Sequence, residues 1–329
     1  MTIFLHIGLS KTGTTFVQHC FNQPQIDTQL REGFQLKQSI NASTIIWALV
    51  KKDIISVGSK NGDPIERFLN YENVSNATRV EVRKLIRGEI QDSVRHLFFS
   101  AEGISDLAVF NKKFVNSKSF VQIIKDFVLQ SNLTQKLKII LTIRRQDQFL
   151  ESSYMQNIRT GSTLSFDDYV KLIPMKNLSW LTLIEHLTDV VGNKNLIVLP
   201  YESELHRLNG NAHFLQPLLK SIDQRITMDA LEINGLTPIQ QMPIGNPTLL
   251  PEKLSAAIEA NKTLPSSEAF TAYKELAKKF PKLPGQPFNL LSNKKRAELI
   301  SHFSNENSMM FTKFLPEYNG SFYIQELKA

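Results

Sequence analysis

A glycine-bounded loop near the N-terminus has the residue types of an anion-binding site. Residues Gly8–Thr15 read GLSKTGTT and lie between an apolar run, Thr2–Ile7, and a helical pattern that starts at Phe16. Unpaired N–H groups at a helix N-terminus attract anions, and the helix dipole strengthens that attraction. Lys11 adds a cation and the threonines add hydroxyl donors. The pattern therefore predicts an anion site at the end of the first strand.

The residue order in this loop differs from that of the nucleoside triphosphatase loop, G-x-x-x-x-G-K-[ST]. Here the lysine comes two residues before the second glycine, and two threonines follow that glycine. This order argues against ordinary hydrolysis of ATP or GTP. The alternative interpretation is a polar strand-to-helix turn in which Lys11 is solvated.

A second polar stretch, Arg144–Tyr154, reads RRQDQFLESSY and follows another apolar run. An arginine fork binds phosphate oxygens through two N–H groups, and a serine on the following helix adds a neutral donor. The stretch begins with two arginines and carries two serines on the segment that follows. Taken alone, it is explained equally well by a solvated arginine pair at the end of a strand.

Four short apolar runs predict the buried parallel strands that position these stretches, and helical patterns separate them. The runs are Thr2–Ile7, His96–Ser100, Leu137–Ile143 and Asn195–Pro200. Strands that alternate with helices form βαβ units, in which helices cover both faces of a parallel sheet. Ligands of such sheets bind at the carboxyl ends of the strands, which is where both polar stretches lie.

We therefore expect an α/β fold of the P-loop nucleotide-binding type. Its central parallel sheet should have about four to five strands flanked by helices, followed by a mostly helical region from about residue 209. The chain contains no linker long enough to force a second domain. We expect residues 1–329 to form a single domain.

The composition is that of a folded, weakly basic protein. The 329 residues include 38 Lys and Arg against 31 Asp and Glu, a formal charge of +7, and 42% of them are hydrophobic. One cysteine excludes an internal disulfide framework and a zinc site of several thiolates. The basic residues form no long tract, so we expect a small polyanion rather than nucleic acid as the ligand. No apolar run reaches about 18 residues, so we expect no transmembrane helix and a cytoplasmic location.

The two polar stretches together resemble the phosphate-binding motifs of sulfotransferases that use 3′-phosphoadenosine 5′-phosphosulfate (PAPS). Members of that family carry P-K-[ST]-G-T-[TS] after their first strand, and bacterial members often begin with H-I-G-x-x-K-T-G-T-T. Residues His6–Thr15 match this run, except that serine replaces the usual proline. The resemblance implies that the loop binds the 5′ end of PAPS through Ser10, Lys11, Thr12, Gly13, Thr14 and Thr15.

The family also holds the 3′-phosphate of PAPS with an arginine at a strand end and a serine eight residues later. Arg144 and Ser152 have that separation, and they put Tyr154 where an aromatic residue commonly follows. Arg145 and Ser153 have the same separation, so two registers stay open. The Arg-Lys-Gly signature of the cytosolic members does not occur in the sequence.

The resemblance implies an enzyme that transfers the sulfuryl group of PAPS to a hydroxyl or amine and needs no metal. Lys11 would stabilise charge on the leaving oxygen. Glu102, just after the second predicted strand, corresponds to the general base of the family, although it could also serve as an acidic residue at a helix start. A glutamate base goes with glycan-type acceptors, so the expected acceptor is a carbohydrate or another polyhydroxylated small molecule.

Two other classes of function remain as alternatives. One is a P-loop kinase, which would need Mg²⁺ and an acidic residue to hold it. The other is a nucleotide-binding module without catalytic activity.

Three further features are interpreted as structural: His6 as a core histidine with hydrogen-bond partners, Cys20 as a small packed hydrophobe, and Lys294–Arg296 as the solvated start of an amphipathic helix.

Overall fold

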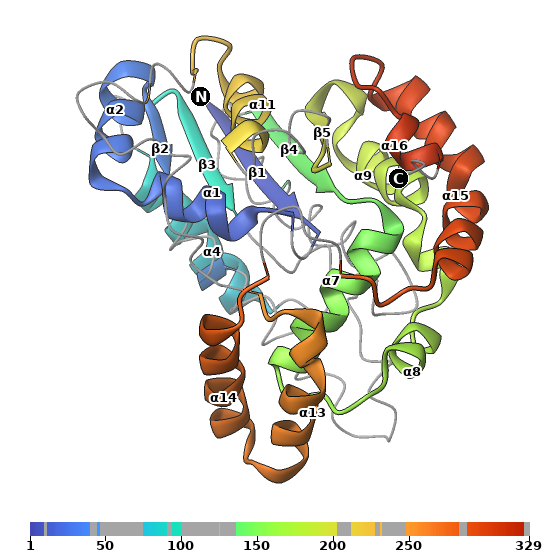
Figure 1. The fold of residues 1–329 in the computed structure, drawn as a ribbon. Helices are drawn as coiled ribbons and strands as arrows, with labels where there is room; N and C mark the ends of the chain where they lie inside the picture. The colour runs from blue at the N-terminus through green and yellow to red at the C-terminus, as the bar shows by residue number, and fades with distance from the viewer. Residues whose placement is uncertain are drawn as a thin grey trace.

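A five-stranded, fully parallel sheet forms the centre of the protein (Figure 1). The computed structural model describes residues 1–9, 12–39, 45–46, 75–90, 94–100, 125, 136–202, 212–227, 231, 248–282 and 288–325. The strands are β1 (Thr2–Gly8), β2 (Leu36–Gln38), β3 (His96–Ser100), β4 (Lys136–Ile143) and β5 (Leu196–Pro200). Their order in the sheet is β2-β3-β1-β4-β5, so the first strand of the chain lies in the middle.

Helices cover both faces of this sheet, as the sequence predicts. The longer helices are α1 (Thr14–Phe21), α2 (Pro24–Phe34), α4 (Asn76–Glu89), α7 (Gln146–Arg159), α9 (Trp180–Val191), α11 (Ala212–Ile222), α13 (Leu254–Thr263), α14 (Ser266–Lys279) and α15 (Asn293–Phe314). The short ones are α8 (Phe166–Lys171), α16 (Ser321–Ile324) and the 3-10 turns Met175–Leu178, Asn193–Asn195 and Pro251–Lys253. The predicted α/β fold with a mostly helical C-terminal region is confirmed.

The hydrophobic core is divided by the sheet into two parts because successive strand residues point to opposite faces. On β1, Ile3, Leu5 and Ile7 enter one part together with residues of α4, α7, α9 and α15. Phe4 enters the other part together with residues of α1, α2 and α11. Strands that are buried on both faces read as continuous apolar runs, which is why four of the five were visible in the sequence.

The C-terminal region has two parts. Helices α13 and α14 form a hairpin that extends away from the sheet (Figure 1), and its base is closed by an antiparallel bridge between Leu249 and Pro281. Helix α15 packs against α7 and α9, and the short α16 lies against α15. The single domain over residues 1–329 stays a prediction, since several stretches lie outside the described residues.

Candidate functional site

The first predicted anion loop joins β1 to α1 at the carboxyl edge of the sheet. Gly13 is the N-cap residue of α1 and has a φ of 79°, a left-handed conformation that costs other residues about 1–2 kcal/mol. At Gly8, an added Cβ would lie 2.4 Å from Oγ1 of Thr14 and 2.5 Å from Oγ1 of Thr12. Gly8 therefore leaves room for the hydroxyls of Thr12 and Thr14 at the end of β1, and Gly13 permits the left-handed turn into α1.

The two described threonine hydroxyls of the loop have different environments. Thr12 is buried, and its Oγ1 donates a hydrogen bond of 2.6 Å to the carbonyl oxygen of Leu9, so it stabilises the loop itself. The Oγ1 atom of Thr14 is buried and makes no hydrogen bond within the described part of the chain. A buried hydroxyl without a partner is unfavourable, and a ligand oxygen at the start of α1 would satisfy it.

Several predicted site residues lie outside the described residues. They are Ser10, Lys11 and Glu102. Thr15 lies in the first turn of α1, but its side chain is not described. The roles predicted for these four residues remain predictions.

His6 connects the three strand ends beneath the loop. Its Nδ1 atom lies 3.2 Å from Oγ of Ser100 on β3, and its Nε2 atom lies 3.0 Å from Oγ1 of Thr142 on β4. Gln18 of α1 also donates from Nε2 to Oγ of Ser100, over 3.2 Å. Burial lowers the pKa of His6 to about 3, so the imidazole is neutral at physiological pH. The interpretation of His6 as a core histidine with hydrogen-bond partners is confirmed.

The second predicted anion site lies at the end of β4, the strand next to β1. Arg144 follows β4 directly, and its Nη1 atom donates to Oγ of Ser152 on α7 over 3.0 Å. Its Nε atom donates to Oε1 of Glu202 over 2.8 Å, and its guanidinium lies over the ring of Tyr201, 5.3 Å from the centroid. The indole N–H of Trp180 donates to the carbonyl oxygen of Arg144 over 2.6 Å. The structure thus brings together the predicted pair Arg144 and Ser152.

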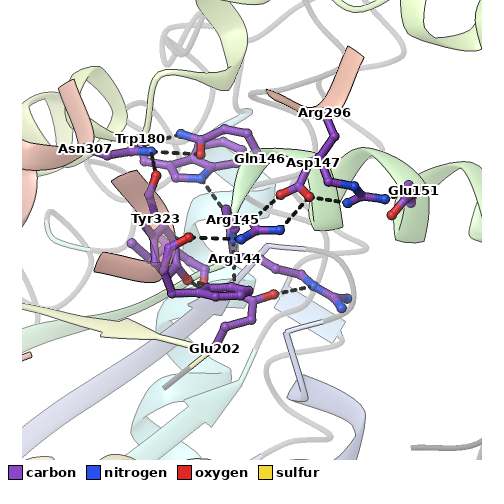
Figure 2. A network of polar contacts seen from close by, with 12 residues as sticks. Arg144, Arg145, Gln146, Asp147, Glu151, Trp180, Glu202, Arg296, Asn307 and Tyr323 are labelled. Atoms are coloured by element: carbon purple, nitrogen blue, oxygen red, sulfur yellow. Dashed lines mark hydrogen bonds and ion pairs between the residues drawn. The ribbon is translucent and has the colours of Figure 1, made fainter. Parts of the chain in front are cut away.

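The neighbouring arginine points into a different, buried network (Figure 2). Arg145 donates from Nε and Nη2 to the two carboxylate oxygens of Asp147, at 2.5 and 2.8 Å. Its Nη1 atom donates to the carbonyl oxygen of Phe322 over 3.0 Å, and its guanidinium stacks 3.9 Å from the centre of that ring. Ser153 does not join Arg145 in the described structure, since its buried hydroxyl makes no hydrogen bond there. The geometry therefore favours the register of Arg144 and Ser152.

The predicted solvated start of α15 is wrong for Arg296. This side chain is buried, bonds to Asp147, and donates from Nη2 to Oε1 of Glu151 over 2.9 Å. Burial alone would raise the pKa of Asp147, but hydrogen bonds and charges from Arg145 and Arg296 lower it. Oε1 of Glu151 also accepts from two backbone N–H groups just before α15. Together these ion pairs fix α15 onto α7 (Figure 2).

Sequence reasoning missed two residues close to the predicted site. Glu202 lies two residues past the end of β5, and its position near a strand end was an available signal. Lys282 lies at the base of the α13–α14 hairpin, with its ammonium over the ring of Phe288 at 4.7 Å. Burial and the charge of Arg144 lower the pKa of Lys282 to about 8, although Glu151 acts in the opposite direction. Lys282 therefore lies in a partly desolvated region, close enough to Arg144 for the two positive charges to interact.

The described residues contain no group of three or more His, Cys, Asp or Glu side chains that could hold a metal ion. In the same residues, no helix combines the length and apolar character needed to cross a membrane.

The comparisons with known proteins give a distant structural likeness. No family model matches the sequence, and no curated protein matches it. The fold is similar to a solved structure described as a sulfotransferase from Alicyclobacillus acidocaldarius, with a TM-score of 0.40 and 15% sequence identity. The likeness covers 84% of this chain and 96% of that chain. A similarity at this level carries no inference about activity, so the function of this chain is inferred from its own site residues.

Proposed function

We propose that this protein is a sulfotransferase that moves the sulfuryl group of PAPS to a hydroxyl or amine. The observation that carries the proposal is that the two predicted anion sites lie at the ends of neighbouring strands. Gly8 pairs with Thr142, two residues before Arg144, and the backbone N–H of Leu9 donates to the carbonyl oxygen of Thr142 over 3.1 Å. A ligand with two separate phosphate groups, such as a 3′,5′-substituted adenosine, fits this arrangement better than a nucleoside triphosphate, whose phosphates form one chain.

The residues of the two sites fit the two ends of such a ligand. In this proposal the loop and the N–H groups at the start of α1 bind the 5′ end of the ligand. The buried hydroxyl of Thr14 would form a hydrogen bond to it there. Arg144 and Ser152, which are already in contact with each other, bind the 3′-phosphate. The half-buried ammonium of Lys282 adds positive charge near Arg144. Gly13 provides the left-handed turn that leads into α1 at this site.

The reaction needs one proton transfer and one stabilised leaving group. Bound PAPS supplies the sulfur atom, which gains a bond to the acceptor oxygen or nitrogen while its bond to the 5′-phosphate oxygen breaks. In the proposed mechanism Lys11 stabilises the negative charge that develops on that phosphate oxygen. Glu102 takes the proton of the acceptor. No metal is required, because the leaving group is a stable phosphate anion.

The acceptor class follows from the proposed base. We propose a carbohydrate or another polyhydroxylated small molecule as the acceptor. In the sulfotransferases that this sequence resembles, enzymes with a carboxylate base act on glycan-type acceptors. Nucleic acid is not proposed as a partner, since the +7 charge is spread along the chain. We further propose that the protein works in the cytoplasm, where its single thiol stays reduced.

Calorimetric titration tests the proposal against its two alternatives. The protein is titrated with 3′,5′-adenosine bisphosphate and with ATP and Mg²⁺, and sulfuryl transfer from labelled PAPS is then measured with phenols, monosaccharides and oligosaccharides. Preference for the bisphosphate together with transfer to a sugar is the expected result. Preference for ATP would favour the kinase. Tight bisphosphate binding without transfer to any acceptor would favour the module without catalytic activity.

Substitutions separate the proposed roles. Lys11→Ala should lower turnover by on the order of 10²–10³, the effect of losing one donor to the transition state. Arg144→Ala should weaken bisphosphate binding by about 2–5 kcal/mol. Arg145→Ala is the matched control, because it removes the same side chain one position away and leaves Asp147 buried beside a single arginine. It should lower the free energy of unfolding by about 3 kcal/mol and weaken bisphosphate binding less than Arg144→Ala does, because Arg144 and Ser152 are retained.

A further inference from the structure

The carboxylate of Glu202, just past β5, forms hydrogen bonds to the end of β4 and to α16, two segments that are distant in the sequence (Figure 2). Its Oε1 atom accepts from Nε of Arg144 over 2.8 Å. Its Oε2 atom accepts from the backbone N–H of Arg145 over 3.0 Å and from the hydroxyl of Tyr323 over 2.8 Å. Because Oε2 is held by two donors, the carboxylate cannot rotate without losing both. Oε1 is thereby directed at Arg144.

Tyr323 comes from α16, at the other end of the chain from the anion loop. The side chain is 1% exposed, and its hydroxyl also lies 3.3 Å from the carbonyl oxygen of Ile143, the last residue of β4. Three further contacts hold this part of α16 in place. Asn307 donates to the carbonyl oxygen of Tyr323 over 2.9 Å, and Arg145 both donates to and stacks on Phe322.

The guanidinium of Arg144 is oriented from two sides. Nε is held by Glu202, and Nη1 is held by Ser152, so the plane of the fork is fixed relative to β4 and α7. A planar fork binds phosphate well only when its N–H groups face the oxygen atoms. Fixing the fork before the ligand arrives removes the entropy that a free arginine side chain would lose on binding.

We propose that Tyr323, acting through Glu202, is a positioning residue that orients Arg144 for the 3′-phosphate of the bound nucleotide. The C-terminal helix α16 is then a part of the nucleotide site, although its tyrosine does not touch the ligand. This inference rests on the proposed function.

The test uses Tyr323→Phe in the full chain, with two ligands that differ by one phosphate. The substitution keeps the ring that packs 5.1 Å from Phe311 and removes only the hydroxyl. We expect the affinity for 3′,5′-adenosine bisphosphate to fall by up to about tenfold, the usual cost of ordering one long side chain on binding. The affinity for adenosine 5′-monophosphate, which has no 3′-phosphate, should stay within about twofold.

Two control variants narrow the interpretation. Tyr318→Phe removes a hydroxyl from a nearby tyrosine, which contacts both parts of the core but makes no bond to Glu202, and should change neither affinity. In an Arg144→Ala background, Tyr323→Phe should cause no further loss of bisphosphate affinity, because the group that it positions is gone.

The outcomes distinguish this inference from the proposed function. If Tyr323→Phe leaves the preference of the protein for bisphosphate over monophosphate intact, the positioning role is wrong and the sulfotransferase proposal stands. Equal losses for both ligands, or a variant that does not fold, would show a structural role only and overturn the inference. If the unaltered protein does not prefer the bisphosphate, both fail.

Discussion

The substitution His6→Gln tests whether a buried neutral imidazole stabilises the strand ends beneath the anion loop. Glutamine keeps a polar side chain of similar length and does not titrate. Burial lowers the pKa of His6 from 6.5 to about 3. Above pH 6.5 neither the folded nor the unfolded state binds a proton at this ring. Below it, the unfolded state takes up the proton and the folded state does not, so stability is lost as the pH falls toward 3.

The size of this loss follows from the two pKa values. Between pH 7.5 and pH 5.0, the difference in proton binding at His6 removes about 2 kcal/mol from the free energy of unfolding. The glutamine variant has no imidazole at this position, so it does not show this loss of stability. It should be less stable than the unaltered protein at pH 7.5, because one of the bonds to Ser100 and Thr142 is lost, by about 1–3 kcal/mol. The stability difference between the two proteins should then shrink by about 2 kcal/mol at pH 5.0.

Urea denaturation of both proteins at the two pH values measures this difference. Other titrating groups, including the carboxylates of the ion-pair network, are present in both proteins and cancel. His302→Gln, at an exposed position on α15, is the matched control and should show no such change. A stability difference that stays constant between pH 7.5 and 5.0 would refute the argument, because it would mean that His6 takes up a proton as readily in the folded state as in the unfolded one.

Three further substitutions or modifications test the site and its support. Gly8→Ala should lower the free energy of unfolding by about 1–3 kcal/mol and weaken bisphosphate binding, because its Cβ meets two hydroxyls; Gly33→Ala, with nothing within 4 Å, is the control and should not destabilise. Glu151→Gln should cost about 3 kcal/mol in urea denaturation, since it leaves the guanidinium of Arg296 buried without one of its carboxylate partners; an unchanged midpoint would contradict this. Alkylation of Cys20 by iodoacetamide should proceed no faster than unfolding, because burial raises the pKa of the thiol to about 12; rapid labelling of the folded protein would disprove it.

Much of the sheet could be predicted from the sequence, and one strand could not. Buried parallel strands need apolar residues on both faces, so β1, β3, β4 and β5 appear as apolar runs. The edge strand β2 has three residues, Leu36–Gln38, and only Leu36 is buried. A strand this short has no periodicity to detect.

The pairing of Arg144 with Ser152 was predictable, while its support was not. A separation of eight residues is about two helical turns, a distance that the long side chain of Arg144 can span to reach Ser152 on α7. Tyr323 reaches Glu202 from 121 positions away, and no local pattern encodes such a contact. Arg296 was misread because it follows two lysines at the start of a helix. Asp147 and Glu151, one turn apart on α7, signal a cationic partner once that face is known to be buried.

The central position of β1 has a consequence for how the chain is made. β1 is synthesised first, yet both of its hydrogen-bonding neighbours come much later, since β3 begins at His96 and β4 at Lys136. A nascent chain therefore carries an apolar strand that lacks both neighbours until β3 has been made and one neighbour until β4 has been made. Chains that stop before Lys136 leave one edge of this strand without its partner and are prone to aggregate. We therefore expect aggregation to be most frequent before β4 has left the ribosome.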